Sequence, residues 1–438
     1  LLERGQPDAA VAELARLVDQ QPRQALFLSN LLLTSQYVPG VTAESLFDLH
    51  ALWRARFPPP APLVAAPRDP DPERKLTIAF LSADFAHHAV GYFMRPLVAA
   101  LPPSACRLIA IASGARRDAV TPLFARLAHD WHDVGETPDA EVAALVATLG
   151  VDVLVDMAGH TNGNRLGVFA RRAAPVQISW AGYVGTTGVP GIDAVLADAH
   201  QAPPEEDRWY HEQVLRLPRC YVPYQPPDYA PEVGPLPADA NGHVTFGSMS
   251  APAKLNDQII GLWARVLATV PGSRLSLRYR GLDSQANRQR ITAIMAAAGV
   301  AAGRLSFAGL SSHKEVLTAY HGVDIALDPF PYSSGVTACE ALYMGVPLVT
   351  LRGATFAGRH ATTYLSALGL QDLVATTPQA YVAACAGLAG NIAGLRDLRA
   401  GLRARMRASA LFDYAGYAAD FLAAVRRLWR EKCAAAGG

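Results

Sequence analysis

Short apolar runs that alternate with helical segments are the feature of this sequence that most constrains its fold. After residue 74, runs typical of buried strands occur at 76–81, 106–112, 151–156 and 176–180, with helices expected around 92–100, 118–128 and 139–149. Strands without polar alternation are buried on both faces, as in parallel sheets that helices cover on each side. This part of the chain is therefore predicted to be a doubly wound α/β domain.

A second series of the same kind follows a Pro-rich passage, Pro218–Pro237. Its expected strands are 244–247, 274–278, 305–307, 325–327 and 347–350, and its expected helices are 256–269, 284–298, 312–321, 337–344, 359–367 and an amphipathic 412–432. At 438 residues the chain is too long for one simple core and suits two such domains. Two doubly wound domains in tandem are expected to face a ligand cleft at the carboxyl ends of their strands.

A short all-α segment is expected ahead of these two series. Apolar residues recur at helical spacing from Ala9 to Val18, and Pro22 ends that run. The run resembles the second helix of a tetratricopeptide unit, with an ordinary helical cap as the alternative, and because the chain starts at Leu1 rather than Met, we expect that upstream sequence is missing. The expected boundaries are a helical part at 1–57, a Pro-rich linker at 58–73, and domains at 74–238 and 239–438.

Charge and cysteine content argue against several classes of protein. The 39 basic residues are balanced by 38 acidic ones, which argues against a dedicated nucleic-acid binder. The five cysteines are scattered without a C-x-x-C pair, so neither a disulfide framework nor a zinc site is expected, and a reducing, cytoplasmic location fits. Because no run of about 18 apolar residues occurs, we expect no membrane span. The oligomeric state is left open.

The segment 328–340 has the composition of a phosphate-binding loop. A strand ends there, a loop rich in Pro, Ser and Gly follows, and a helix is expected to begin near Thr337. Free N–H groups and the positive end of the helix dipole favour a diphosphate, so the candidate residues for binding it are Ser334, Gly335, Val336 and Thr337. Glu340, one turn later, is placed to reach a ribose hydroxyl. Alternatively, Ser334 or Thr337 only caps the helix and Glu340 completes a capping box.

Lys254 is a candidate for stabilising the leaving group. Only four of the 39 basic residues are lysines: Lys75, Lys254, Lys314 and Lys432. Lys254 lies in the loop that follows the first strand of the second domain, and its ammonium would offset the charge of a departing diphosphate. The sequence has no P-loop motif, and the glycines at 182–188 lack the dinucleotide-binding spacing, so other phosphate chemistries are not indicated.

Histidines follow two strands of the first domain. Asp84, His87 and His88 come directly after the first expected strand, and His160 follows the strand at 151–156. A histidine with a pKa near neutrality can orient or deprotonate an acceptor hydroxyl. No cluster has the spacing of metal ligands, so neither a metal nor another cofactor is expected. A diphosphate site with a cation and no metal is typical of sugar transferases built from two Rossmann-like domains.

Seven ordered stretches across both domains resemble the catalytic region of the protein O-GlcNAc transferase and SPINDLY family. They are 80–88, 159–161, 172–188, 244–254, 327–332, 337–347 and 353–359. The resemblance implies a GT-B fold and metal-independent, inverting transfer of one sugar from a nucleotide donor to Ser or Thr hydroxyls of acceptor proteins. By the same resemblance, His88 and Lys254 match active-site residues, residues 335–337 the phosphate-binding helix start and Glu340 the ribose contact. Further candidates in these stretches are Asp84, His160, Tyr183 and Arg359.

The donor is open between UDP-GlcNAc, which we favour, and GDP-fucose. The stretches 250–253 and 335–337 differ from the usual O-GlcNAc pattern, and 159–161, 245–248 and 339–345 resemble the SPINDLY branch, whose plant members use GDP-fucose. Two further alternatives remain: a binding or scaffold protein with a degenerate cleft, and a GT-B enzyme that acts on a glycan or small molecule.

Overall fold

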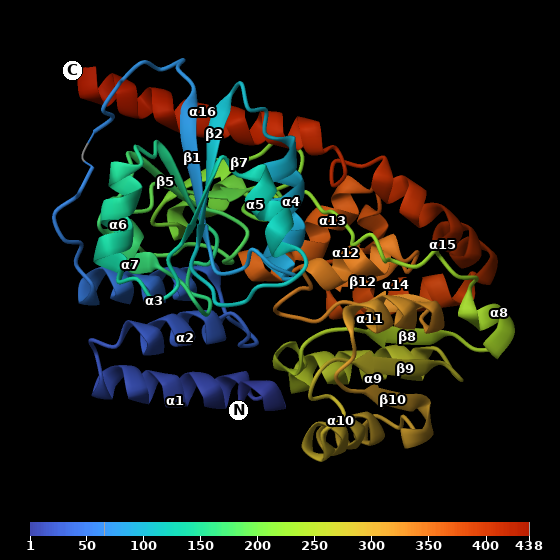
Figure 1. The fold of residues 1–438 in the computed structure, drawn as a ribbon. Helices are drawn as coiled ribbons and strands as arrows, with labels where there is room; N and C mark the ends of the chain where they lie inside the picture. Colours follow the sequence, from blue (N-terminus) through green and yellow to red (C-terminus); the bar gives the residue numbers. More distant parts are fainter. Residues whose placement is uncertain (65, 438) are drawn as a thin grey trace. The chain divides into compact units, whose positions relative to one another are not determined.

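Two parallel sheets organise the chain, as the alternating apolar runs predict. In this computed structural model, residues 1–64 and 66–437 are described; Ala65 of the expected linker and Gly438 of the expected second domain lie outside them. The strand order is β3-β2-β1-β4-β5-β6-β7 in the first sheet and β10-β9-β8-β11-β12-β13 in the second. In both parallel sheets, successive strands are added first on one side of the first strand and then on the other, so the predicted doubly wound α/β class is confirmed (Figure 1).

The first sheet places the ends of its central strands at one edge. Its strands are β1 (Leu76–Ser82), β2 (Cys106–Ala112), β3 (Asp130–Asp133), β4 (Val153–Asp156), β5 (Val176–Ser179), β6 (Ala194–Ala197) and β7 (Gln213–Arg216). Its helices include α4 (Ala89–Ala100), α5 (Thr121–Leu127), α6 (Asp139–Thr148) and α7 (Leu166–Ala170). Leu81 pairs with Asp156, and Asp156 with Ser179, so the loops that follow these strands start side by side.

The second sheet is built in the same way. Its strands are β8 (Thr245–Ser248), β9 (Arg274–Arg278), β10 (Leu305–Ala308), β11 (Ile325–Leu327), β12 (Leu348–Leu351) and β13 (Val374–Ala375). Its helices are α8 (Pro237–Asn241), α9 (Asp257–Thr269), α10 (Gln285–Ala297), α11 (His313–Ala319), α12 (Val336–Tyr343), α13 (His360–Ala367), α14 (Pro378–Gly390) and α15 (Ile392–Arg407). The apolar faces of α9 and α14 pack with the strands around Trp263 and Tyr381, whose indole N–H and hydroxyl lie 3.1 Å apart.

The last helix, α16 (Tyr414–Gly437), packs on the first sheet, whereas the sequence-based boundaries assigned it to the second domain. The ring of Phe421 lies 6.1 Å from that of Phe80 on β1 and 6.1 Å from that of Trp180. The Tyr417 hydroxyl donates to the Tyr221 carbonyl at 2.6 Å. The amphipathic pattern of α16 shows that one face is buried but not which sheet covers it.

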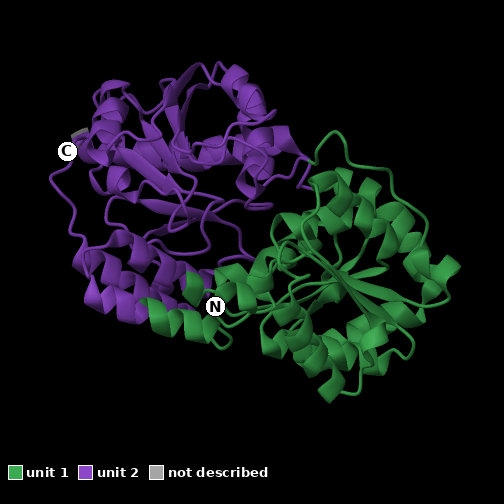
Figure 2. Cartoon of the chain, turned by 60° about the horizontal axis from the view of Figure 1, so that its bottom comes forward, with its two compact units in different colours: residues 1–14, 34–42, 226–409 green, residues 15–33, 43–225, 410–438 purple. Residues whose placement is uncertain are grey.

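The chain forms two compact units (Figure 2). Unit 1 holds the second sheet and comprises Leu1–Leu14, Thr34–Thr42 and Pro226–Ser409; unit 2 holds the first sheet and comprises Ala15–Leu33, Ala43–Gln225 and Ala410–Gly438. The expected N-terminal helices are present as α1 (Pro7–Gln20), α2 (Ala25–Ser35) and α3 (Ala43–Arg56). Parts of this helical segment therefore belong to each unit. None of the helices in the described ranges is long and apolar enough to cross a lipid bilayer.

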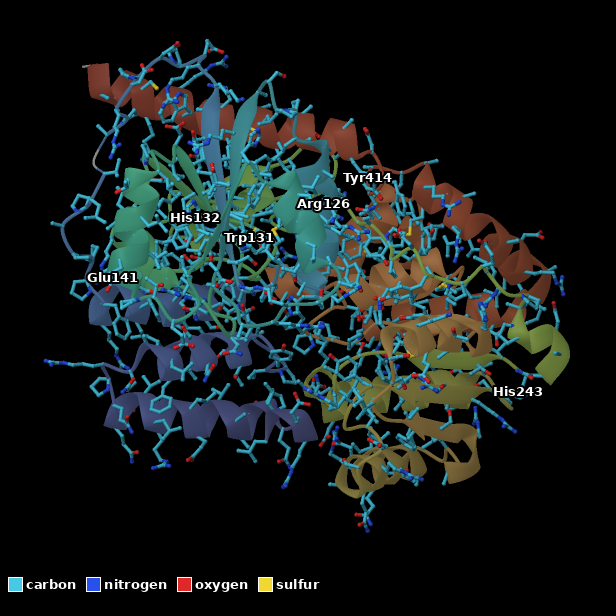
Figure 3. All side chains as sticks on the ribbon, viewed as in Figure 1. Arg126, Trp131, His132, Glu141, His243 and Tyr414 are labelled. Atoms are coloured by element: carbon cyan, nitrogen blue, oxygen red, sulfur yellow. The ribbon has the colours of Figure 1, made fainter. Side chains whose placement is uncertain are left out.

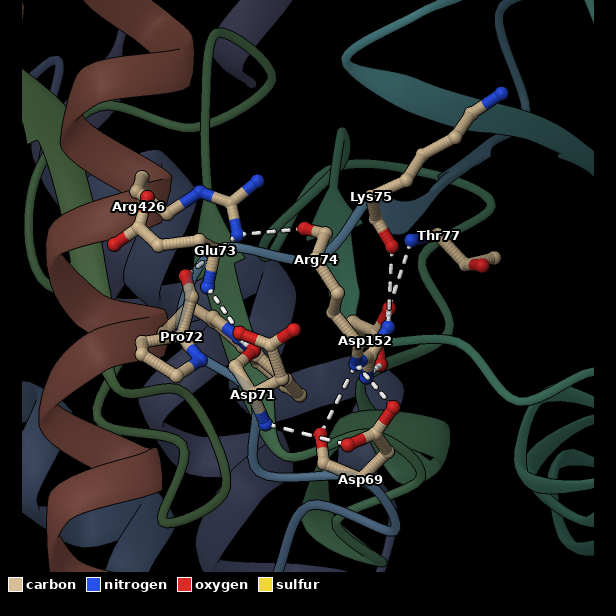
Figure 4. A network of polar contacts seen from close by, with 10 residues as sticks. Asp69, Asp71, Pro72, Glu73, Arg74, Lys75, Thr77, Asp152 and Arg426 are labelled. Atoms are coloured by element: carbon tan, nitrogen blue, oxygen red, sulfur yellow. Dashed lines mark hydrogen bonds and ion pairs between the residues drawn. The ribbon is translucent and has the colours of Figure 1, made fainter.

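Polar contacts fix the C-terminal part of the Pro-rich segment in unit 2 (Figure 4). Arg74 forms a bidentate pair with Asp152, at 2.9 and 2.6 Å, and its guanidinium also lies 4.6 Å from the ring centre of Trp429 on α16. Asp69 and Asp71 are exposed, and their carboxylates accept backbone N–H bonds that order the turn.

Candidate active site

The loops after β8 and β11 meet in unit 1 because these strands are hydrogen-bonded neighbours, with Phe246 opposite Ile325. A short 3₁₀ turn, Pro252–Lys254, brings Lys254 to the loop after β11. Asn256 caps α9 through its side-chain oxygen and donates from its amide nitrogen to the Phe330 carbonyl at 2.6 Å. The two loops therefore form one hydrogen-bonded surface at the carboxyl edge of the sheet, where parallel α/β sheets bind ligands.

Lys254 is held at this edge by two contacts. Its Nζ donates to the Ser333 carbonyl at 2.7 Å and lies 4.1 Å from the centre of the Tyr332 ring, within the range of a cation–π interaction. Burial disfavours the charged amine and lowers the pKa of Lys254 to about 8, although the nearby Asp328 carboxylate acts in the opposite direction. The lysine is thus a cation whose charge changes close to neutral pH.

Asp328 fixes the loop that Lys254 contacts. This buried carboxylate accepts from the Ser333 hydroxyl at 2.7 Å, the Ser334 backbone N–H at 2.8 Å and the Thr350 hydroxyl at 2.7 Å. Burial raises the pKa of Asp328, and the three hydrogen bonds oppose that effect. Because its acceptors are used within the protein, Asp328 shapes the loop instead of presenting a carboxylate to a ligand.

The helix α12 begins where the sequence predicts a phosphate site. Its N-cap is Gly335, which has no side chain, so Ser334 and Thr337 do not cap the helix. Val336 and Thr337 form its first turn, and the Tyr320 hydroxyl donates to the Thr337 carbonyl at 3.0 Å. A helix start without a side-chain cap leaves its N–H groups available to an anion.

Glu340 belongs to a chain of hydrogen bonds and not to a capping box. Its carboxylate accepts from His313 Nε2 at 2.6 Å, and His313 Nδ1 accepts from the Tyr229 hydroxyl at 2.6 Å. The Glu340 side chain is only 4% exposed, whereas Tyr229 is exposed. The contact orients the Glu340 carboxylate on the second turn of α12.

Arg359 is buried and lies in the loop after β12. Its Nε donates to the Gly353 carbonyl at 2.9 Å, and the Gly353 N–H donates to the Gly358 carbonyl at 2.9 Å, which closes the loop. The adjacent His360 ring is 5.9 Å from that of Tyr332. Burial, aided by the charge of Lys254, lowers the pKa of His360 to about 3, so this histidine is neutral near pH 7.

In unit 2, Asp84 and His88 lie in the loop after β1. His88 is the N-cap of α4: its Nδ1 accepts from the Val90 N–H at 3.3 Å and is also 3.3 Å from Asp84 Oδ2. The intervening Phe85 anchors the loop, with its ring 5.1 Å from that of Trp131 on β3. Trp131 is labelled in Figure 3. Burial raises the pKa of Asp84. The His88 side chain, 42% exposed, remains accessible from solvent.

His160 and Tyr183 are placed in the interior of unit 2. His160 Nε2 donates to the Thr187 carbonyl at 2.7 Å, so its Nδ1 accepts from the Ser29 hydroxyl at 3.0 Å. The Tyr183 hydroxyl donates to His50 Nε2 at 2.8 Å. Burial lowers the pKa of His160 to about 3 and that of His50 to about 4. These contacts join helices α2 and α3 to the loops of the sheet, which is a structural role.

Several residues of the site were not singled out by sequence reasoning. Asp328 and Tyr332 lie within the family-like stretch 327–332, and a buried strand followed at once by an acidic residue is a signal for Asp328. His313, Tyr229 and Asn256 carry no comparable signal, because only the fold brings them to α12 or to the loop after β11. Within the described ranges, no group of three or more His, Cys, Asp or Glu residues could hold a metal ion.

The sequence profile of glycosyl transferase family 41 matches residues 61–223 and 234–421. The chain belongs to this family. The "Probable UDP-N-acetylglucosamine--peptide N-acetylglucosaminyltransferase SPINDLY" of Solanum lycopersicum is 34% identical over 410 residues, which are 92% of this chain and 44% of the relative. The Arabidopsis thaliana relative named SEC is 26% identical over 381 residues. This family 41 chain thus spans less than half the length of the curated relatives it matches.

Solved structures agree with the family 41 assignment. A lysine-to-methionine variant of the Thermobaculum terrenum O-GlcNAc transferase is 34% identical, has a TM-score of 0.93 and is similar over 100% of this chain and 83% of its own. Sucrose-phosphate synthase from Thermosynechococcus elongatus, at 14% identity and a TM-score of 0.54, shares the fold alone. The GT-B fold class expected for a family 41 chain is confirmed.

Proposed function

We propose that this family 41 chain is a protein O-glycosyltransferase that moves one sugar from a nucleotide-sugar donor to Ser or Thr hydroxyls of acceptor proteins. The observation that carries the proposal is the pairing of Lys254 with the loop at the start of α12. The ammonium of Lys254 contacts the Ser333 carbonyl in the loop that leads into α12. The N-cap of this helix is Gly335, which offers no side-chain cap. This combination suits the diphosphate of a nucleotide sugar.

In the proposed reaction the acceptor hydroxyl oxygen bonds to the anomeric carbon of the sugar. The bond from that carbon to the donor phosphate oxygen breaks, and the nucleoside diphosphate leaves with the electron pair. Lys254 and the first N–H groups of α12 stabilise the charge on this leaving group, which takes the place of a metal ion. His88 accepts or orients the proton of the acceptor hydroxyl. A single displacement of this kind inverts the anomeric centre.

Each remaining candidate has a role that its environment supports. Glu340, held by His313, is proposed to bind the ribose hydroxyls, and residues 334–337 the phosphates. Asp84 is proposed to stabilise the protonated form of His88, because its carboxylate is 3.3 Å from Nδ1. Arg359 closes the loop next to His360 and is proposed to shape the donor site without contacting the donor.

The proposed donor is UDP-GlcNAc, with GDP-fucose as the alternative. The names of the plant relatives and of the Thermobaculum enzyme refer to N-acetylglucosamine, which supports the first. The SPINDLY-like stretches at 159–161 and 339–345 support the second.

A donor screen with intact-mass readout tests the proposal. The purified chain, with a Ser/Thr-rich protein mixture, is given UDP-GlcNAc or GDP-fucose in separate reactions, and the added mass identifies the sugar. Transfer from one donor, lost in Lys254→Ala, is expected. If the chain binds nucleotide but transfers neither sugar to any protein, the result supports a binding or scaffold protein. If sugar is added only to free glycans, the result supports a GT-B enzyme with glycan acceptors.

A further inference from the structure

Tyr37, in the turn after α2, stacks on Tyr332 beside Lys254. The ring centres of the two tyrosines lie 4.6 Å apart with 25° between their planes, and Lys254 Nζ lies 4.1 Å from the centre of the Tyr332 ring. All three residues belong to unit 1, although Tyr37 comes from the N-terminal helical segment. Tyr332 thus contacts both the candidate catalytic lysine and a residue far away in the sequence.

The turn that carries Tyr37 is well defined. The Tyr37 N–H donates to the Thr34 carbonyl at 3.0 Å and the Val38 N–H to the Ser35 carbonyl at 3.2 Å. Gly40 adopts a φ of 84°, a left-handed conformation that glycine accepts without strain. The Tyr37 side chain is partly buried, and burial holds the pKa of its hydroxyl well above the ordinary value, so the ring remains neutral.

A second contact joins the N-terminus to the same region of unit 1. Gly5 has a φ of 68°, and a Cβ at this position would lie 2.6 Å from the carbonyl oxygen of Leu255, the residue after Lys254. Arg290 donates to the same carbonyl at 2.7 Å, and Asn287 donates to the Glu3 carbonyl at 3.1 Å. Residues 3–5 and the turn at Tyr37 therefore both pack next to the segment that carries Lys254.

We propose that Tyr37 is a positioning residue for Lys254: by stacking on Tyr332 it keeps that ring against the ammonium, so that the helical segment forms part of the donor site. The inference rests on the proposed function, because the position of Lys254 matters for transfer only if the chain is a transferase. Aromatic stacking and cation–π contacts both depend on ring geometry, so loosening Tyr332 should displace the ammonium.

The charged and titratable groups around these rings are few. Asp328, His360 and Tyr332 face Lys254, while Glu3 and Tyr279 influence Tyr37. Replacing Tyr37 by Leu or Phe changes none of these charges. An altered titration of Lys254 in such variants therefore reports a change in packing or hydration.

The scarcity of lysine allows a direct test that needs no turnover. Pulse acetylation with acetic anhydride across a pH series, followed by peptide mass spectrometry, gives the titration of each lysine, with exposed Lys75 and Lys314 as internal controls. In the unmodified protein Lys254 is expected to titrate near 8. In Tyr37→Leu, water reaches the Lys254 amine, so its pKa is expected to rise towards about 10.4. Tyr37→Phe keeps the aromatic ring and is expected to leave the pKa of Lys254 unchanged.

Kinetics give the second readout. Tyr37→Leu should lower kcat about tenfold while KM for the donor changes less than about threefold, and Tyr37→Phe should restore the rate to within about twofold. Leu26→Ala, an exposed change elsewhere in the helical segment, is the control. If Tyr37→Leu lowers the thermal midpoint, it is replaced by Tyr37→Met, whose unbranched side chain adapts to irregular gaps.

Unchanged lysine titration and unchanged kcat in the folded Leu or Met variant would overturn the inference. Failure of the proposed function would give a different set of results: Lys254→Ala would keep full transfer, or the chain would transfer no sugar at all. The acetylation experiment would still report whether Tyr37 acts on Lys254.

Discussion

The ammonium of Lys254 lies 2.7 Å from the carbonyl oxygen of Ser333. The contact links a loop that follows β8 to one that follows β11, and Asp328 holds the second loop through Ser333 and Ser334. A cation that a backbone carbonyl fixes in advance needs little rearrangement when negative charge develops on a leaving group. This relationship is the basis for the predictions on activity.

Lys254→Ala is expected to lower kcat by about 10²- to 10³-fold, because one preorganised group that stabilises developing charge contributes on this scale. Lys314→Ala, at an exposed lysine, is the matched control and should retain full activity. Single-turnover transfer with the preferred donor measures the effect, and thermal unfolding checks that the variant is folded. Wild-type kcat in Lys254→Ala would rule out the assigned role.

The pH dependence of kcat/KM should report the titration of Lys254. Because burial lowers its pKa to about 8 and the charged form is the active one, kcat/KM should fall as the pH rises through about 8. An ordinary lysine would keep its charge to about 10.4. Initial rates between pH 6.5 and 9.5 at low donor concentration provide the measurement; a profile that stays flat to pH 9.5 would contradict the prediction.

Glu340→Gln should weaken donor binding by about ten- to a hundredfold, because a hydrogen bond to a charged group contributes about 1.5–3 kcal/mol. Calorimetric titration with UDP or GDP measures the dissociation constant. Glu315→Gln is the control, since Glu315 is an exposed capping residue of α11 and Gln can also cap. Equal affinities for the Glu340 variant and the unmodified protein would exclude a ribose contact.

His88→Ala should reduce kcat by about 10²-fold or more without changing donor affinity, because His88 belongs to unit 2 and the proposed donor contacts to unit 1. His87→Ala is a matched control: the neighbouring imidazole pairs with Asp118 at 3.3 Å. Transfer rates and nucleotide titrations on both variants separate the two effects. A loss of donor affinity in His88→Ala would assign it to donor binding instead.

The stability of the protein should fall as the pH falls below about 6.5. His50, His160 and His360 are buried and neutral, with pKa values lowered to about 4, about 3 and about 3, while all three titrate near 6.5 in the unfolded chain. The unfolded state therefore binds more protons in this window, and each histidine costs about 1.4 kcal/mol per pH unit. Urea midpoints at pH 7.5 and 5.5 test this.

Two variants refine the stability measurement. His160→Gln removes one of the buried imidazoles and should reduce the dependence of the urea midpoint on pH. His200→Gln, at an exposed histidine, should leave that dependence as it is. A midpoint that does not change between pH 7.5 and 5.5 would show that the three buried histidines do not bind protons on unfolding.

The sequence by itself determined the parallel α/β class and most element positions, because strands buried on both faces must be continuously apolar. Of the strands it did not predict, β3 (Asp130–Asp133), β7 and β13 lie at the edges of their sheets, and β6 is an apolar run of only four residues. Ala-rich α14 lacks a clear amphipathic period. A hydrophobic pattern identifies a helix or strand only when one or both of its faces differ in polarity from the neighbouring sequence.

Tertiary structure alone decided which distant residues contact the side chains of the sequence motifs. Lys254 and the loop after β11 were apparent from the sequence, but the contacts of Glu340 with His313, of Tyr332 with Tyr37 and of α16 with the first sheet were not. It also decided that His160 is enclosed by Ser29 and Thr187, although its sequence context suggests a catalytic histidine. The physical reason is that composition and spacing specify local conformation, whereas burial and partners depend on which distant segments the fold brings together.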